Sequence, residues 1–271
     1  MNIKMSGFLM AFVASMFFFS SNTVAQTSKP RQQGELYFSW GYNKEWYAPS
    51  TIKISQPELG NNYSFKKVKG HDRPGWDKKL FSVAITIPQY SYRLGYFFND
   101  KKDLGIEINF DHTKFIFGDG PVRIKGTLNN KQVDTSLNFS SVDGFHYYLN
   151  NGANFLLFNI MKRWHWHTRS NENIKFDVIG KAGVGPVIPH VDNSFFGNAN
   201  EPGFQIGGWN MGTELAIRST FFKHVYLEFA GKLDYARYSK LKVYKGDARH
   251  DFGTGELILS FGYTLKTGRK R

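Results

Sequence analysis

The sequence predicts an all-β protein, a transmembrane antiparallel up-and-down barrel of about eight strands with long extracellular loops. Aromatic residues make up 17% of the 271-residue chain and there are 27 glycines, a mixture that favours strands and tight turns. Segments of about ten residues alternate apolar and polar side chains, as strands do when one face meets lipid. The chain has no cysteine, which excludes disulfides, thiolate metal sites and thiol nucleophiles.

The first 25 residues have the pattern of a secretory signal peptide. Lys4 supplies the basic start, residues 8–19 form an apolar run, and Ala25 ends a small-residue cleavage site. The run is shorter than the roughly 20 apolar residues of a membrane-spanning helix. We therefore expect export and cleavage before Gln26. The expected divisions are a signal peptide at 1–25, a lead at 26–33, a barrel at 34–266 and a basic tail at 267–271.

The first three predicted strands, 35–43, 89–98 and 104–115, show the alternation most simply. Every second residue from Leu36 to Tyr42, from Tyr90 to Tyr96 and from Leu104 to Phe110 is apolar or aromatic. In the third strand, Glu107, Asn109 and Asp111 occupy the opposite face. Because charges lie on one face and aliphatic side chains on the other, a strand buried on both faces is excluded.

The remaining predicted strands repeat this pattern with one interruption. Segment 145–160 is broken at Asn150-Asn151-Gly152, where a bulge could move the apolar face to the other side, so its register stays open. The last four strands each set aliphatic or aromatic side chains against charges, and they span 174–186, 205–221, 224–238 and 253–264.

The connections alternate between short and long, as in barrels that pair short periplasmic turns with long external loops. The short set is 99–103, 163–173 and the residues around Lys223, and the long set is 44–88, 118–144, 190–204 and 239–252. This order places both termini in the periplasm. The long loops contain alternating stretches of their own at Thr51–Ser55, Tyr63–Lys69 and Val122–Thr127, which predict hairpins above the membrane.

Together with the signal peptide and the eight strands, two runs carry a family resemblance: Tyr92–Phe98 (YRLGYFF) and Gly105–Phe110 (GIEINF). The chain resembles the small Gram-negative outer-membrane β-barrels related to the OmpA membrane domain. The likeness covers nearly all of the mature chain and is one of pattern. It departs from that pattern by continuing past the last strand into Lys266–Arg271. The resemblance implies an outer-membrane location, and we expect a monomer with no cofactor.

The polar faces of the predicted strands collect charges that would point into the lumen. They are Arg93, Glu107, Asp111, Lys181, Glu214, Arg218, Glu228, Lys232, Asp234 and Glu256. Eight strands leave an interior that side chains fill, and charges confined there must pair to offset their desolvation. We expect a salt-bridged plug, and the alternative is a gated ion path through the same network.

Several serine, histidine and acidic residues could support nucleophilic catalysis of the Ser-His type. They are His190, Asp192 and Ser194, the pair Asp111 and His112, and Ser141 with His146. Some small outer-membrane barrels deacylate or acylate lipid A, so an enzyme of that kind is the main alternative, although no nucleophile motif matches. Trp164-His165-Trp166-His167 could hold a metal ion, but an aromatic girdle explains its tryptophans better.

The mature chain is basic, since the net charge is +13 and becomes +12 when Lys4 leaves with the signal peptide. The first external loop holds much of this charge, and we single out Lys66, Lys67 and Lys69 as a basic patch among aromatic residues. A secreted protein rarely meets nucleic acid, whereas the outer leaflet is dense with phosphates. The sequence therefore favours a non-enzymatic barrel of structural or envelope-binding role, with loops that contact lipopolysaccharide or another surface ligand.

Overall fold

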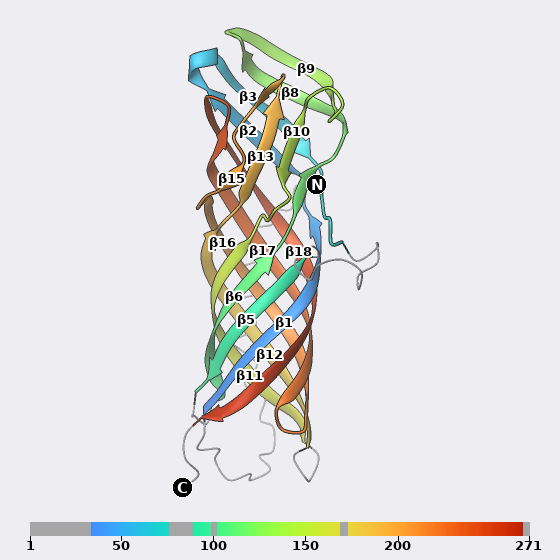
Figure 1. Cartoon of the computed structure of the whole chain (residues 1–271), viewed down its shortest axis with the longest axis vertical. Helices are drawn as coiled ribbons and strands as arrows, with labels where there is room; N and C mark the ends of the chain where they lie inside the picture. The colour runs from blue at the N-terminus through green and yellow to red at the C-terminus, as the bar shows by residue number, and fades with distance from the viewer. Residues whose placement is uncertain (1–33, 76–88, 99–101, 169–172, 268–271) are drawn as a thin grey trace, which may run out of the picture.

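Eight long strands form a closed barrel in the computed structural model, which describes residues 34–75, 89–98, 102–168 and 173–267. They pair antiparallel in the order β1-β5-β6-β11-β12-β16-β17-β18, and β18 pairs with β1 to close the ring (Figure 1). The strands are β1 Gly34–Tyr47, β5 Tyr90–Phe97, β6 Leu104–His112, β11 Phe155–Thr168, β12 Ile174–Val187, β16 Gly208–Phe221, β17 Val225–Val243 and β18 Gly246–Thr267. The predicted fold class is confirmed.

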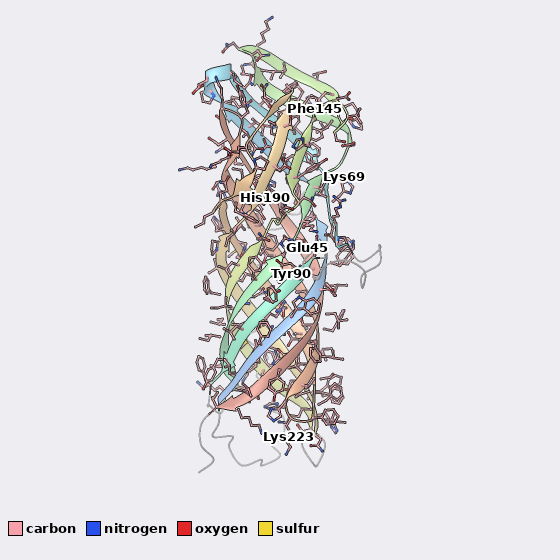
Figure 2. The ribbon with its side chains drawn as sticks, viewed as in Figure 1. Glu45, Lys69, Tyr90, Phe145, His190 and Lys223 are labelled. Carbon is pink, nitrogen blue, oxygen red and sulfur yellow. The ribbon has the colours of Figure 1, made fainter. Side chains whose placement is uncertain are left out.

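The lower end of the barrel holds the turn between β16 and β17, where Figure 2 labels Lys223. Gly34, the start of β1, is the register partner of Thr267, the end of β18, so both ends of the described chain lie there. The expected signal peptide and lead, and the tail after Thr267, lie outside the described residues. In the described part of the chain, no helix is long and apolar enough to span a membrane.

The outward faces of the barrel strands form an apolar belt. Ile108 on β6, Ile160 on β11 and Leu259 on β18 are each about half exposed, while their sequence neighbours Asn109, Asn159 and Ser260 are buried. Since these aliphatic side chains cover the outside of a closed barrel, they face lipid and the polar faces fill the lumen. Both facing predictions for β6 and β18 are therefore correct.

Above the belt the chain builds a packed extension. The strands β2 Ser50–Gln56, β3 Asn61–Val68, β8 Gly120–Leu128 and β9 Lys131–Phe139 extend the sheet beyond β18. A second sheet faces them, made of β4 Gly70–His71, β7 Phe115–Phe117, β10 His146–Leu149, β13 His190–Phe195 and β14 Asn198–Ala199, with β15 Gly203–Phe204 paired to β13. Figure 1 shows these strands at the upper end, and the predicted hairpins above the membrane are confirmed.

The two sheets enclose an aromatic core. Phe65 of β3 contacts the rings of Phe117, Phe139 and Phe195, which come from three different outer segments. Phe155 and Val187, at the outer ends of β11 and β12, and Tyr238 and Phe252, within β17 and β18, belong to the same buried cluster. The apolar core of the extension therefore lies over the outer mouth of the lumen.

Some predicted boundaries are wrong, and the extension explains most of them. The expected loop 239–252 is almost entirely strand, because β17 and β18 continue upward to a turn at Tyr244 and Lys245. Segment 145–160 is two strands, β10 and β11, which belong to different sheets and are separated by the turn at Asn150. The expected turn 163–173 starts too early, because β11 runs to Thr168. Pairing with distant strands, which local patterns do not encode, sets these limits.

The belt predicts a depth-dependent response to charge on β18. Replacing Leu259 with Arg should reduce the stability of the assembled barrel by about 2–4 kcal/mol, because the guanidinium would face hydrocarbon. Asp247→Arg on the same outward face but above the belt is the control and should change stability by roughly 0.5 kcal/mol or less. Heat-modifiable migration on gels after refolding into lipid vesicles measures the folded fraction. Equal losses for the two variants would contradict the assigned belt.

Candidate functional site

The centre of the lumen is a cluster of two cations and three carboxylates. Nη1 of Arg93 lies 2.7 Å from both carboxylate oxygens of Glu214 and 3.5 Å from Glu107. Nζ of Lys181 lies 2.8 Å from Glu107, 3.1 Å from Glu214 and 3.2 Å from Glu228. Each carboxylate is thus shared between cations, which offsets the cost of burying them.

Below this cluster, Arg218 is held by one carboxylate and two aromatic rings. Its Nε donates to Glu228 at 2.7 Å, and its guanidinium lies 4.2 Å from the ring centre of Tyr37 and 4.0 Å from that of Tyr226. The hydroxyl of Tyr37 donates to Glu107 at 2.5 Å. Because cation–π contacts strengthen when water is removed, the two tyrosines support a cation that has one carboxylate partner.

At the outer end of the lumen carboxylates outnumber cations further, and one lysine lies near three carboxylates. Nζ of Lys232 lies 2.5 Å from Asp111 and 3.5 Å from both Asp234 and Glu256. The amide of Asn43 donates to Glu256 at 2.8 Å. All ten residues of the predicted network line the lumen, each at most 3% exposed. The functional role of the network stays a prediction.

Sequence reasoning missed the neutral and terminal partners of these charges. Tyr37 and Asn43 lie on the polar face of the first predicted strand, and the predicted network includes no residue of that strand. Glu45, which is buried and bonded to the side chain of Asn43, follows at the next alternate position beyond the predicted end of the strand. Continuing the alternation past Asn43 would have found it. Glu35, on the polar face of the first predicted strand, and Arg163, at the start of an expected turn, were also missed, and they lie 2.9 Å apart near the lower rim.

The candidate catalytic residues are brought together only in part. Nε2 of His146 lies 2.9 Å from Asp192, and Ser194 is the register partner of His146, but no described hydrogen bond joins Ser194 to that ring. Ser141 donates instead to Asp119, and the ring of His190 packs on Phe204. His112 is bonded to Asn154, and its lumen neighbour Asp111 pairs with Lys232.

A Ser-His contact that the sequence did not suggest lies inside the extension. Oγ of Ser50 is 3.3 Å from Nδ1 of His250, and both residues are buried. The rings of Phe115, Tyr147 and Phe252 surround this histidine. Burial in this extracellular core lowers the pKa of His250 to about 3, so the ring is neutral at physiological pH. A neutral histidine sealed among aromatic rings has no access to a substrate.

At the possible metal site at 164–167, the ring nitrogens of His165 contact carboxylates. Nδ1 of His165 lies 2.6 Å from Asp177 and Nε2 lies 3.2 Å from Asp103, so both ring nitrogens have carboxylate partners. Trp166 is 71% exposed on the outside of the same strand. Within the residues that the structure describes, no group of three or more His, Asp or Glu side chains could hold a metal ion.

The outer sheet presents three cations in a row that crosses four strands. Arg249 of β18 is the register partner of Lys53 on β2, which pairs with Ser64 on β3, and Ser64 pairs with Lys125 on β8. Arg249, Lys53 and Lys125 are exposed on the outward face. Of these three cations only Arg249 and Lys53 are directly opposite on neighbouring strands, where like charges repel each other, and an anion between them would relieve that repulsion.

A second row beside the first contains part of the predicted basic patch. Lys66 on β3 is the register partner of Arg123 on β8, and Lys67 and Lys69 lie exposed at the end of β3. Asp134 on β9 accepts hydrogen bonds from Arg123. Arg123 and Lys125 together lower the pKa of the Asp134 carboxyl to about 2. Figure 2 places Lys69 between the levels of Glu45 and Phe145, above the barrel.

Together the two rows form what we call the basic face: Lys53, Lys66, Arg123, Lys125 and Arg249. In the described part of the chain, Asp134 is the carboxylate within ion-pair distance of this set, and it contacts Arg123 and Lys125. Because Arg249 and Lys53 are far apart in sequence, only the pairing of β18 with β2 reveals their neighbourhood. The arrangement can attract a polyanion.

No family model matches the chain, and no curated protein matches it. Among solved structures, the chain is similar to Ail of Yersinia pestis in complex with the heparin analogue sucrose octasulfate, with 14% identity, a TM-score of 0.33, and 86% of this chain and 99% of that chain covered. It is also similar to OprG of Pseudomonas aeruginosa, with 12% identity, a TM-score of 0.40, and 88% and 99% covered. Both are small outer-membrane barrels, the class that the sequence resembles.

The lumen cluster predicts a strong asymmetry between single and paired substitutions. Arg93→Met should reduce the free energy of unfolding by about 3–5 kcal/mol, because it leaves Glu214 with one cation fewer in a buried site. The double variant Arg93→Met with Glu214→Leu should recover much of this loss, since both charges are gone. Guanidinium unfolding in detergent measures both. A single variant as stable as the wild type would show that the pair contributes nothing.

The buried histidine predicts a pH dependence for the extension. The pKa of His250 is about 3 when folded and about 6.5 in an unfolded chain, so the unfolded state binds more protons and stability falls as the pH drops below about 6.5. The loss attributable to this group should be about 2 kcal/mol at pH 5. His250→Phe keeps the aromatic packing, and thermal unfolding at pH 7.5 and pH 5 compares it with the wild type. The same pH response in both proteins would exclude this origin.

Proposed function

We propose that the protein is an outer-membrane barrel that holds a packed basic sheet above the outer leaflet, where it contacts anionic groups of the envelope, lipopolysaccharide foremost. The observation that carries the proposal is the register pairing of Arg249 with Lys53 on the outward face. The repulsion between these neighbouring cations is relieved when a phosphate or carboxylate lies between them. Export with a cleaved signal peptide and a monomeric state are parts of the same proposal.

The architecture supports a binding surface in preference to a mobile loop. The basic face lies on strands whose inward residues Ile52, Phe65 and Ile124 are buried in the extension core. A surface on a packed sheet loses little conformational freedom when a ligand binds, so more of the electrostatic attraction appears as affinity. The patch predicted from sequence joins this surface, because Lys66 is a member and Lys67 and Lys69 lie beside it.

Two other functions fit the structure less well. A channel would need a polar path, whereas salt bridges fill the lumen and the apolar cluster containing Phe155 and Tyr238 lies over its outer end. A lipid A deacylase or acyltransferase could draw on His146 and Asp192, but the described contacts give His146 no hydrogen bond to a serine. A non-enzymatic binding or structural barrel therefore agrees best with the contacts.

Neutralising the basic face should weaken binding to lipopolysaccharide. In the triple variant Lys53→Gln, Lys66→Gln and Arg249→Gln, affinity should fall roughly tenfold, because three ion pairs at the surface contribute about 1–2 kcal/mol together. Surface plasmon resonance on the purified protein in detergent measures the affinity at several salt concentrations. Wild-type binding should weaken as salt rises, since exposed charges are screened.

A matched control removes three exposed cations elsewhere: Arg237→Gln, Lys240→Gln and Lys223→Gln. This control changes net charge equally and should retain affinity within about twofold. An equal loss in the control, or binding that salt does not affect, would refute a specific role for the basic face.

A further inference from the structure

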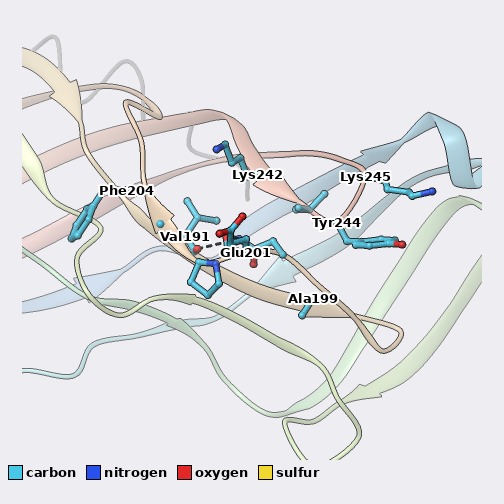
Figure 3. Close-up of a pocket in the computed structure, with 11 residues that line it drawn as sticks. Val191, Ala199, Glu201, Phe204, Lys242, Tyr244 and Lys245 are labelled. Atoms are coloured by element: carbon cyan, nitrogen blue, oxygen red, sulfur yellow. Dashed lines mark hydrogen bonds between the residues drawn. The ribbon is translucent and has the colours of Figure 1, made fainter.

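A pocket separate from the basic face lies on the outside of the extension. It has a volume of about 470 Å³ and opens between the loop at 199–204 and the tip of the β17–β18 hairpin at 242–245 (Figure 3). The buried side chains of Val191 and Val243 contribute to its lining. This volume is within the roughly 300–1,000 Å³ that is usual for small-molecule sites.

Hydrogen bonds hold both walls of the pocket. Asn200 donates to the carbonyls of Val191 and Glu201, which fixes the loop against β13. The side chain of Asn193 donates to the carbonyl of Lys242 at 2.9 Å and ties β13 to the hairpin. Gln56 of β2 donates to the carbonyl of Tyr244 at 2.6 Å and anchors the hairpin tip. The pocket is therefore formed before any ligand binds, which lowers the entropic cost of binding.

The pocket lining combines charges of both signs with aromatic surface. Lys242 and Lys245 lie on the hairpin wall, and Glu201 lies on the loop wall. In the described part of the chain, neither Lys242 nor Glu201 has an ion-pair partner, whereas Lys245 lies 3.5 Å from Glu58. Tyr244 is 37% exposed on the hairpin, and Figure 3 shows it beside Lys245.

We propose that this pocket binds one ring of an acidic saccharide. The carboxylate or phosphate of the sugar would pair with Lys242, its hydroxyls would donate to Glu201, and the apolar face of the ring would pack on Tyr244. Glu201 disfavours a bare polyanion and favours a ligand that also offers donors. The inference deepens the proposed envelope-binding function and rests on it, because it names a carbohydrate class and a second contact point.

Titration calorimetry of the purified full-length protein in detergent tests the site with glucuronic acid as the probe. We expect saturable binding in the millimolar range, as is usual for a monosaccharide with few contacts. Lys242→Gln should weaken it about tenfold, because a charge-assisted hydrogen bond is lost. Tyr244→Ala should weaken it by a similar factor. Lys240→Gln removes a cation that does not line the pocket, and it should leave the affinity unchanged.

Glucose and inorganic phosphate separate the two halves of the proposed recognition. If glucose and phosphate each bind more weakly than glucuronic acid, the site recognises the sugar ring and the negative charge together. Equal binding of phosphate, no binding of glucuronic acid, or unchanged affinity in Lys242→Gln would overturn the proposal. Competition by an acidic lipopolysaccharide core oligosaccharide or by a heparin fragment supports the site and distinguishes the two sources of acidic sugar.

The failure of this inference can be told apart from failure of the proposed function. The triple variant of Lys53, Lys66 and Arg249 should keep its affinity for glucuronic acid, because those residues do not line the pocket. If lipopolysaccharide binding falls in the triple variant while glucuronic acid never binds, only the pocket proposal is wrong. If glucuronic acid binds as expected while the triple variant binds lipopolysaccharide normally, only the basic face is wrong.

Discussion

An eight-stranded barrel has room inside for little more than its own side chains, and the rest of this structure depends on how the chain fills that space. Within the apolar belt the filling is ionic, because the outward positions are given to lipid and the inward positions to charges such as Arg93 and Glu214. Above the belt water replaces lipid on the outside, and the filling becomes apolar. On β17 the same inward face carries Asp234 in the lumen and Tyr238 in the extension.

This exchange of polarity gives the outer segments the character of a folded domain. Their inward residues meet in an aromatic core around Phe65, and their outward residues face solvent, where charged side chains keep their hydration. The basic face and the pocket both depend on that division, because each lies on strands whose inward side chains are packed in the extension core. The barrel therefore supports the extension, and the surfaces proposed for recognition lie on the extension.

The sequence predicted the membrane part of the structure far better than the outer part. Alternation from Leu104 to Asp111 is enforced by lipid on one side and the lumen on the other, so the facing of β6 could be predicted from local pattern. The charges that fill the lumen could also be named, because a charged residue on that face has nowhere else to point. Their individual partners could not, since the contact between Arg93 and Glu214 depends on the register of several intervening strands.

Distance along the chain explains what was missed in the extension. Lys53 was one of many lysines in an expected loop, and its neighbour Arg249 lies almost 200 residues later. Likewise, the segment at 239–252 has the composition of a loop, but it continues two barrel strands because their inward residues find an apolar core contributed by other segments. Tertiary packing decides such cases, and a local pattern cannot anticipate it.

The continuity of β17 and β18 has a consequence for how this surface can change during evolution. Solvated loops tolerate insertions at little cost, but one residue inserted into a paired strand exchanges its inward and outward faces unless a bulge absorbs it, as the register shift between Tyr238 and Leu241 does in β17. Variation among related chains would therefore follow a period of two along 246–252 of β18, with outward positions such as Arg249 diverging freely and inward positions such as His250 and Phe252 restricted in size. Change on this surface would proceed mainly by substitution at outward positions, and length variation would concentrate at the turn at Tyr244 and Lys245 and at the register shift between Tyr238 and Leu241.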